Sequence, residues 1–312
     1  MFVVRRACRR TSFFAIVLLA GLGSRAVAQA AAGFEAKTMT LGIVAETHQK
    51  EIEGHFQEFV RYVAARVSGS TAPMQGRVLV ATTQSRLANL LREKRVDFYM
   101  ESSHPTYMIN NVYGVAKLLL RRWKGGMADY HAAIFTNKSG ETKRLEDLKG
   151  KILAFEDNES TSGFFLPRQF LIRKGFRLSQ KAQIDAAVGR DEIGYIFAQS
   201  QGKLVDLVLA KKVAAGAFSN DDYATLDSNK KAEVVILAET ASLPRHLVSV
   251  RKDLPAALAK GLEKTLLSMH QNSEGRSILQ KADGTTKFDA LPGGELAVRQ
   301  RLLDIYYSPQ KQ

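Results

Sequence analysis

Apolar and polar positions follow two alternating periods along the chain, which predict strands and helices in succession. Short apolar runs predict buried strands at 40–45, 78–81 and 96–100. Between them, apolar residues spaced three and four apart predict helices at 49–67 and 85–93, and Pro105 can open the next helix. This β-α-β-α-β order is typical of a parallel sheet with helices on both faces.

A second series of the same kind begins near residue 130. Strands are predicted at 130–135, 151–155, 184–188 and 213–218. Helical segments are predicted at 145–150, from about 164 to 174, and at 191–201. Leu254-Pro255 opens a helix, Ser273 caps another, and residues 295–306 form the last. No Pro- or Ser-rich linker separates the two series, so we expect two lobes joined by close-spaced crossings, with a ligand cleft between them.

The first 30 residues have the composition of a secretory signal peptide. Four arginines within residues 1–10 precede an apolar run at 13–22, and small residues including Ala28-Gln29-Ala30 follow. The run is shorter than the roughly 20 residues that a membrane span needs. Cys8 precedes the run and therefore cannot be a lipoprotein cysteine. We expect export to a bacterial periplasm, with lobe 1 at 38–122 and 243–307 and lobe 2 at 123–242.

The charge of the chain changes when the signal peptide is set aside. The full chain has 45 Lys and Arg against 31 Asp and Glu, a formal charge of +14. Five arginines fall within residues 1–30, which leaves 40 basic residues and a charge of +9. Most of these are mixed with acidic residues, so they predict a solvated surface rather than a nucleic-acid interface.

The inventory of reactive side chains excludes several chemistries. The six histidines are scattered, without the spacing of a metal site, and no glycine-rich nucleotide loop occurs. No nucleophile and base stand in a known catalytic motif. We therefore expect no metal, no cofactor and no enzymatic activity, and we expect a monomer.

One motif points to a ligand. Glu159-Ser160-Thr161-Ser162-Gly163 lies between a predicted strand and a predicted helix. Hydroxyls, free backbone N–H groups and the positive end of the helix dipole can together bind an oxyanion without a countercharge. Ser and Thr are also preferred N-caps, worth about 1 kcal/mol, so helix capping alone is the alternative.

The segment around this motif resembles a known family. Residues 143–175 contain D-L-K-G-K and S-T-S-G in the arrangement found in phosphate, phosphite and phosphonate substrate-binding proteins of ABC importers. Weaker matches at 41–45, 95–97 and 214–218 follow in the same order, and the resemblance spans about 38–290. It implies a type II periplasmic binding protein: α/β, with two lobes, each a mainly parallel sheet flanked by helices, joined by a hinge. It also implies an oxyanion ligand and a permease partner.

The resemblance also implies a set of ligand-binding residues. Ser160, Thr161, Ser162 and Gly163 would hold the phosphoryl oxygens. The loop after the third strand would contribute from the opposite lobe Glu101, Ser102, Ser103, His104 and Tyr107. The loop after the first strand, with Thr47 and His48, is expected to face the same cleft. For His48 and His104, a surface or packing role is the alternative to ligand contact.

Two positions depart from the family pattern. Arg190 stands where many members have a histidine, and either pairs with an oxyanion or faces solvent. Glu101 replaces a glycine, and its carboxylate would repel a dianion. Glu101 therefore points either to a ligand with an ammonium group, such as an aminoalkylphosphonate-like zwitterion, or to a ligand without phosphorus.

The fold leaves more than one function open. A transport receptor predicts a permease partner, whereas a sensory receptor of the same fold predicts a histidine kinase or a chemoreceptor. Neighbouring genes would distinguish the two.

Overall fold

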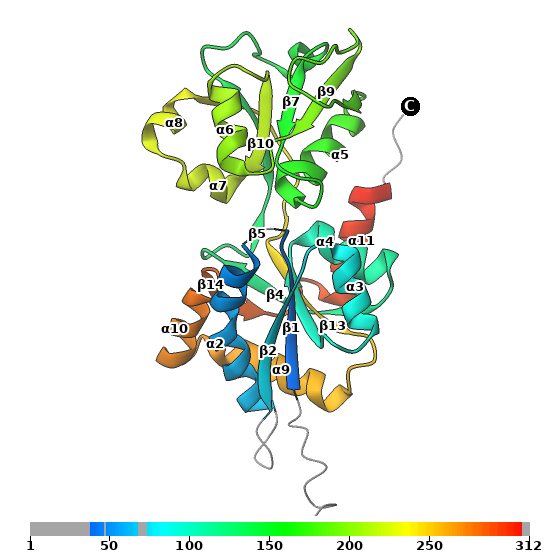
Figure 1. Cartoon of the computed structure of the whole chain (residues 1–312), viewed down its shortest axis with the longest axis vertical. Coiled ribbons are helices and arrows are strands. Elements are labelled where there is room, and N and C mark those ends of the chain that lie inside the picture. Colours follow the sequence, from blue (N-terminus) through cyan, green and yellow to red (C-terminus); the bar gives the residue numbers. More distant parts are fainter. Residues whose placement is uncertain (1–37, 47, 68–73, 308–312) are drawn as a thin grey trace, which may run out of the picture. The chain divides into compact units, whose positions relative to one another are not determined.

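The structure is a computed structural model that describes residues 38–46, 48–67 and 74–307 (Figure 1). Two six-stranded sheets flanked by helices make up most of the described chain, which confirms the predicted α/β class. The predicted signal peptide, 1–30, lies outside the described residues. Within the ranges described, no helix is long and apolar enough to cross a membrane.

The first sheet has the strand order β14-β4-β13-β3-β1-β2. These strands are β1 (Thr38–Val44), β2 (Gln75–Ala81), β3 (Phe98–Glu101), β4 (Ala116–Lys124), β13 (His246–Arg251) and β14 (Thr285–Asp289). Its helices are α2 (Gln49–Val67), α3 (Gln84–Arg92), α9 (Ala256–Met269) and α10 (Ser273–Lys281), while α4 (Ser103–Tyr107) and η1 (Met108–Val112) follow β3. The predicted apolar face of α2, including Phe59, Val60 and Val63, is fully buried in the core of this sheet.

The second sheet has the order β11-β6-β10-β7-β9-β8. These strands are β6 (Ala132–Asn137), β7 (Ile152–Phe155), β8 (Arg177–Gln180), β9 (Glu192–Phe197), β10 (Ala215–Ser219) and β11 (Val234–Glu239). Its helical segments are η2 (Leu145–Leu148), η3 (Thr161–Phe165), α5 (Leu166–Arg173), α6 (Gln201–Leu209), α7 (Asn220–Thr225) and α8 (Ser228–Glu233). Phe135, Leu153 and Phe155 are fully buried inside it.

The chain crosses between the sheets at a small two-stranded sheet. β5 (Asp129–Tyr130) follows the first sheet and pairs antiparallel with β12 (Leu243–Pro244), which follows the second. The last helix, α11 (Gly294–Tyr307), contacts both α4 and α5. The chain thus crosses between the two sheets at neighbouring segments, as predicted. The exact lobe boundaries stay a prediction.

Both sheets are mixed rather than mainly parallel. β4 and β13 pair antiparallel with each other, β14 pairs antiparallel with β4, and β6 and β11 do the same in the second sheet. Strands β4, β8, β11, β13 and β14 were absent from the sequence prediction.

The sequence prediction was wrong around residues 184–201. The structure has no strand at 184–188, and β9 occupies 192–197 where a helix was expected. The residues from Ile193 to Ile196 are all buried, and such a continuous apolar run does not distinguish a central strand from a buried helix. At α10 the cap is Asn272, whose side chain accepts the Gly275 N–H, rather than Ser273.

Candidate functional site

The ends of the strands bring the loop after β3 and the segment Ser160–Gly163 to one edge of each sheet. In the first sheet, β3 ends at Glu101, and β13 begins at the same edge because Leu247 pairs with Glu101 in antiparallel register. In the second sheet, the parallel strands β7 and β10 end at Phe155 and Ser219. The segment Ser160–Gly163 follows β7. Ligands of open α/β sheets bind outside such carboxyl ends.

Thr161 joins the two edges. Its hydroxyl donates to the Ser102 hydroxyl at 2.9 Å and accepts the His104 backbone N–H at 2.9 Å. Glu159 makes a second contact, accepting the Gln84 N–H at the start of α3 at 3.4 Å. Thr161 is only 2% exposed, so these groups meet in a region with little access to water.

Ser160 organises the loop that carries the motif. Its hydroxyl accepts the Gly163 N–H at 3.0 Å, as an N-cap, and donates to Glu156 Oε2 at 2.9 Å. Asp157 Oδ1 accepts the N–H groups of Glu159 and Ser160 at 2.7 and 2.8 Å. Ser160 therefore caps the helical segment. Thr161 and the buried Ser162 belong to the first turn of that segment and are not its cap.

Gly163 is required by close packing. A Cβ at this position would lie 2.6 Å from Glu156 Cβ and 2.8 Å from Ser160 Oγ. No other residue fits here without displacing the loop.

Glu101 lies beside this contact as a partly exposed side chain. Its Oε1 accepts the Val44 N–H at 2.7 Å. Burial raises the pKa of Glu101 to about 8, the charge of Glu159 raises it further, and the Val44 N–H and Arg122 lower it. At neutral pH the carboxyl group therefore holds its proton.

Three predicted site residues of the loop after β3 have structural partners. The buried Ser103 donates to the Pro244 carbonyl at 3.0 Å. Tyr107 is buried and stacks on Tyr306 with 3.6 Å between ring centroids. The His104 ring hydrogen-bonds Tyr306 through Nδ1 and stacks on Phe165 at 4.5 Å, so its backbone rather than its ring meets Thr161.

The remaining predicted residues are Arg190, His48 and Thr47, of which the first two are exposed. Arg190 is exposed and precedes the amino end of β9, which runs parallel to β7, so it lies at the edge opposite Ser160–Gly163. His48 is exposed one residue before α2, with a left-handed φ of 55°. Thr47 lies outside the described residues.

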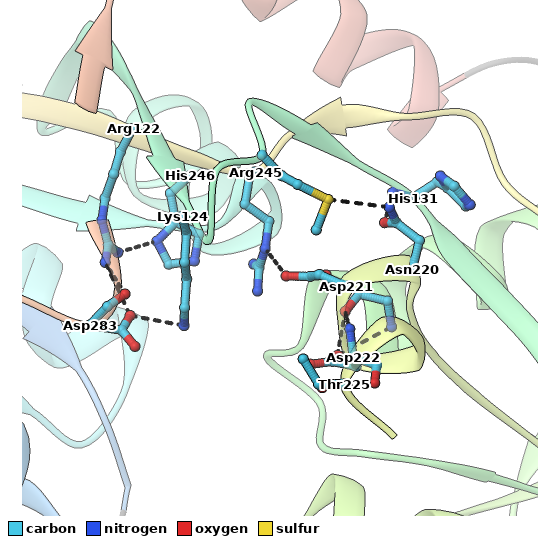
Figure 2. Close-up of polar contacts among 12 residues, drawn as sticks. Arg122, Lys124, His131, Asn220, Asp221, Asp222, Thr225, Arg245, His246 and Asp283 are labelled. Atoms are coloured by element: carbon cyan, nitrogen blue, oxygen red, sulfur yellow. Dashed lines mark hydrogen bonds and ion pairs between the residues drawn. The ribbon is translucent and has the colours of Figure 1, made fainter. Parts of the chain in front are cut away.

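Sequence reasoning missed a charged group next to Thr161. Arg245 donates to Asp221 Oδ2 at 2.7 Å (Figure 2). Its guanidinium lies 4.4 Å from the centre of the Tyr130 ring. Asp221 Oδ1 is buried and has no hydrogen-bond partner in the described part of the chain. Burial raises the pKa of Tyr130, and hydrogen bonds with Thr161 and Ser102 work against that rise. Asp221 follows the carboxyl end of β10, and that position could have identified it.

A second missed group surrounds Arg122, which is only 1% exposed. Its guanidinium donates to His246 Nδ1 at 2.7 Å and to Asp283 Oδ2 at 3.1 Å (Figure 2). It also donates to Thr285 Oγ1 at 2.7 Å. Because a guanidinium can only donate, Nδ1 of His246 is the acceptor and Nε2 carries the proton. Burial and then the charge of Arg122 lower the pKa of His246, so the ring stays neutral. Lys124 shares the Asp283 carboxylate at 2.9 Å.

A metal site is not present among the residues described, which contain no group of three or more potential ligands from His, Cys, Asp and Glu. The groups that meet at this contact are hydroxyls and a backbone N–H group, with buried charges nearby. A family model described as the periplasmic substrate-binding protein of phosphonate ABC transporters matches residues 41–292. The chain belongs to this family. Membership implies a small-molecule ligand, a permease partner and a periplasmic location, and it is consistent with the expectation of no enzymatic activity.

Solved structures of related proteins share the fold. A protein of Xanthomonas citri bound to ATP has a TM-score of 0.78 at 25% identity, covering 86% of this chain and 96% of that one. PhnD1 of Prochlorococcus marinus in complex with methylphosphonate has a TM-score of 0.64 at 14% identity, covering 86% and 97%. A binding-protein component of an ABC phosphonate transporter from Pseudomonas aeruginosa has a TM-score of 0.64 at 16% identity, covering 86% of each chain. The predicted type II periplasmic binding protein fold is confirmed. A search of curated proteins found no match.

Proposed function

We propose that the protein is the solute-binding component of an ABC importer and binds a phosphonate-, phosphite- or phosphate-like oxyanion between the carboxyl edges of its two sheets. The observation that supports this most directly is the meeting of Thr161 with Ser102 and the His104 N–H, each at 2.9 Å. The protein is expected to be exported by residues 1–30 and to act as a monomer.

Hydroxyl and amide donors suit an oxyanion at this place. An oxyanion between the two edges would replace the Thr161–Ser102 hydrogen bond with bonds to its own oxygens. The N–H groups at the start of η3 and α5, a continuous helical segment from Thr161 to Arg173, add the positive end of a helix dipole. Affinity would come from neutral donors in a buried setting, where each hydrogen bond is electrostatically stronger than in water.

The comparisons support a phosphorus oxyanion as the ligand. Methylphosphonate and ATP, present in the related structures, share a tetrahedral phosphorus centre with anionic oxygens. The buried, unpartnered Asp221 Oδ1 further favours a ligand that also donates a hydrogen bond, such as an aminoalkylphosphonate.

A thermal-shift panel on residues 31–312 tests the proposal with phosphate, phosphite, methylphosphonate, 2-aminoethylphosphonate and ATP. A ligand at 100 times its Kd stabilises the folded state by about 2.7 kcal/mol, which at this size raises Tm by about 5–10 °C. The double variant Ser102→Ala/Thr161→Ala should lose this shift. Ser277→Ala, at an exposed position on α10, should keep it. If no phosphorus oxyanion raises Tm, the proposed ligand class is wrong.

Transport and sensing differ in the partner. Reconstitution with the permease encoded beside this gene should give ligand uptake that depends on the binding protein. The sensory alternative predicts a different result. The protein would bind the ligand without such a permease, and its partner would be a histidine kinase or a chemoreceptor.

A further inference from the structure

Glu101 is an acidic residue at the edge of the site proposed for an anion. It ends β3 and precedes Ser102, whose hydroxyl meets Thr161. Its Oε1 is held by the Val44 N–H at 2.7 Å, which fixes the carboxyl group against the end of β1. An ionised carboxylate at this place would repel the oxyanion, so its position needs a chemical explanation.

The charged groups around Glu101 do not neutralise it by direct pairing. Glu159 faces it from the loop before η3, Tyr99 lies on its own strand, and Arg122 faces it from β4. No cation forms an ion pair with Glu101 in the described part of the chain, and the Arg122 guanidinium is bonded to His246, Thr285 and Asp283 instead. The facing carboxyl group of Glu159 disfavours a negative charge on Glu101. Burial, the facing Glu159 and the lack of an ion pair favour the neutral acid, and they outweigh Arg122 and the Val44 N–H, which favour the carboxylate.

We propose that Glu101 contacts the ligand as a neutral carboxylic acid and donates its proton in a hydrogen bond to an oxygen of the bound oxyanion. This inference rests on the proposed function, because it names the chemistry of one residue in that site. With Oε1 held by Val44 as an acceptor, Oε2 is the oxygen that carries the proton. Glu101 thereby selects ligands that present an acceptor oxygen at this edge.

If Glu101 donates as a neutral acid, ligand affinity should fall as the pH rises. Since the pKa of Glu101 is raised to about 8, the acid form dominates at neutral pH and is lost as the pH rises above 8. Binding then requires proton uptake, so Kd should rise about tenfold for each pH unit above 8. Glu101→Gln keeps a donor of the same shape but does not titrate.

The experiment is isothermal titration calorimetry with methylphosphonate from pH 6 to 9.5, on the wild type and on Glu101→Gln. Ionisation of the ligand affects both proteins equally and cancels in the ratio of their Kd values. The ratio of wild-type Kd to variant Kd should be constant below pH 7 and should rise about tenfold per unit above pH 8. Glu146→Gln removes an exposed carboxylate at the far edge of the second sheet and should follow the wild type. Glu101→Leu, which cannot donate, should bind at least tenfold more weakly than Glu101→Gln at pH 7.

Two binding results would overturn the inference while leaving the proposed function intact. One is a flat Kd ratio across the whole pH range. The other is a loss of affinity in Glu101→Gln for 2-aminoethylphosphonate but not for methylphosphonate, which would show an ionised carboxylate paired with ammonium. Titration of Glu101 by carbon-13 NMR on the ligand-free protein gives an independent measurement, and a pKa near 4.5 would also overturn it. If neither protein binds any phosphorus oxyanion at any pH, the proposed function fails and the donor role fails with it.

Discussion

At the scale of single residues, burial decides which side chains near the site carry charge. Burial lowers the pKa of His104 to about 4, although the Asn158 backbone favours the protonated ring. The same effect raises the pKa of Glu101 to about 8. Both side chains are therefore neutral at pH 7, which for Glu101 reverses the ordinary state of a carboxyl group.

His104 should make stability depend on pH on the acidic side. In the unfolded chain it takes up a proton near pH 6.5, whereas in the folded protein it does so near pH 4. Stability is therefore lost as the pH falls from about 6.5 to 4, by up to about 3 kcal/mol. His104→Phe keeps an aromatic ring against Phe165 and removes this loss, as urea unfolding at pH 7 and pH 4 would measure. His55→Gln, on the exposed face of α2, should behave as the wild type. An unchanged acid sensitivity in His104→Phe would refute the assignment.

At the scale of elements, β7, η3 and α5 together position the segment Ser160–Gly163. Phe165 donates its N–H to the Ser160 carbonyl, five residues earlier, at 3.0 Å, so the segment begins with a wide π-helical turn. Such turns are rare and frequently occur at functional sites. Gly163 lies inside this turn, where the side chains of Glu156 and Ser160 leave no room for a Cβ.

Gly163→Ala should destabilise the protein by about 1–3 kcal/mol, because the new methyl group must displace Glu156 or Ser160. Gly202→Ala is the matched control, since a Cβ there has no atom within 4 Å and lies in helix α6. It should be neutral or stabilising by about 0.5–1 kcal/mol. Urea unfolding measures both. Equal effects of the two substitutions would contradict the packing argument.

At the scale of the whole described chain, α11 links elements of both sheets. Tyr306 stacks on Tyr107, which follows β3, at 3.6 Å, and on Phe165, which follows β7, at 4.2 Å. Arg173, at the end of α5, donates to the Asp304 and Ile305 carbonyls at 3.0 and 2.6 Å and so satisfies the end of α11. The last helix therefore stabilises the same arrangement that brings Thr161 to Ser102.

Tyr306→Ala should lower the free energy of unfolding by about 3 kcal/mol, since it removes an aromatic ring packed against three others. It should also weaken methylphosphonate binding, because the contact between the two edges loses support. Tyr307→Ala is the control, as Tyr307 is 68% exposed, and should cost less than about 1 kcal/mol. Thermal unfolding and calorimetry would check both expectations. Loss of stability with unchanged affinity would show that α11 does not support the site.

Local patterns predicted part of this structure correctly. The apolar spacing of α2 and the strand-motif-helix order around Ser160 depend on neighbours in sequence, and both are present. The error at 192–197 came from a strand whose two faces are both buried, a condition that depends on the rest of the sheet. The antiparallel strands β4, β13 and β14 were also not predicted, because their pairing joins residues more than 100 positions apart.

By itself, the sequence determined the α/β class and the family resemblance and located the motif proposed to bind an oxyanion, because each follows from residue types and their order along the chain. Only the tertiary structure decided which groups meet that motif. It brings Ser102 and the His104 N–H to Thr161, brings Arg245 to Asp221, and leaves Arg190 at the opposite edge of its sheet. The physical reason is that distant strands end at shared edges, and burial there sets the charge of Glu101 and His104.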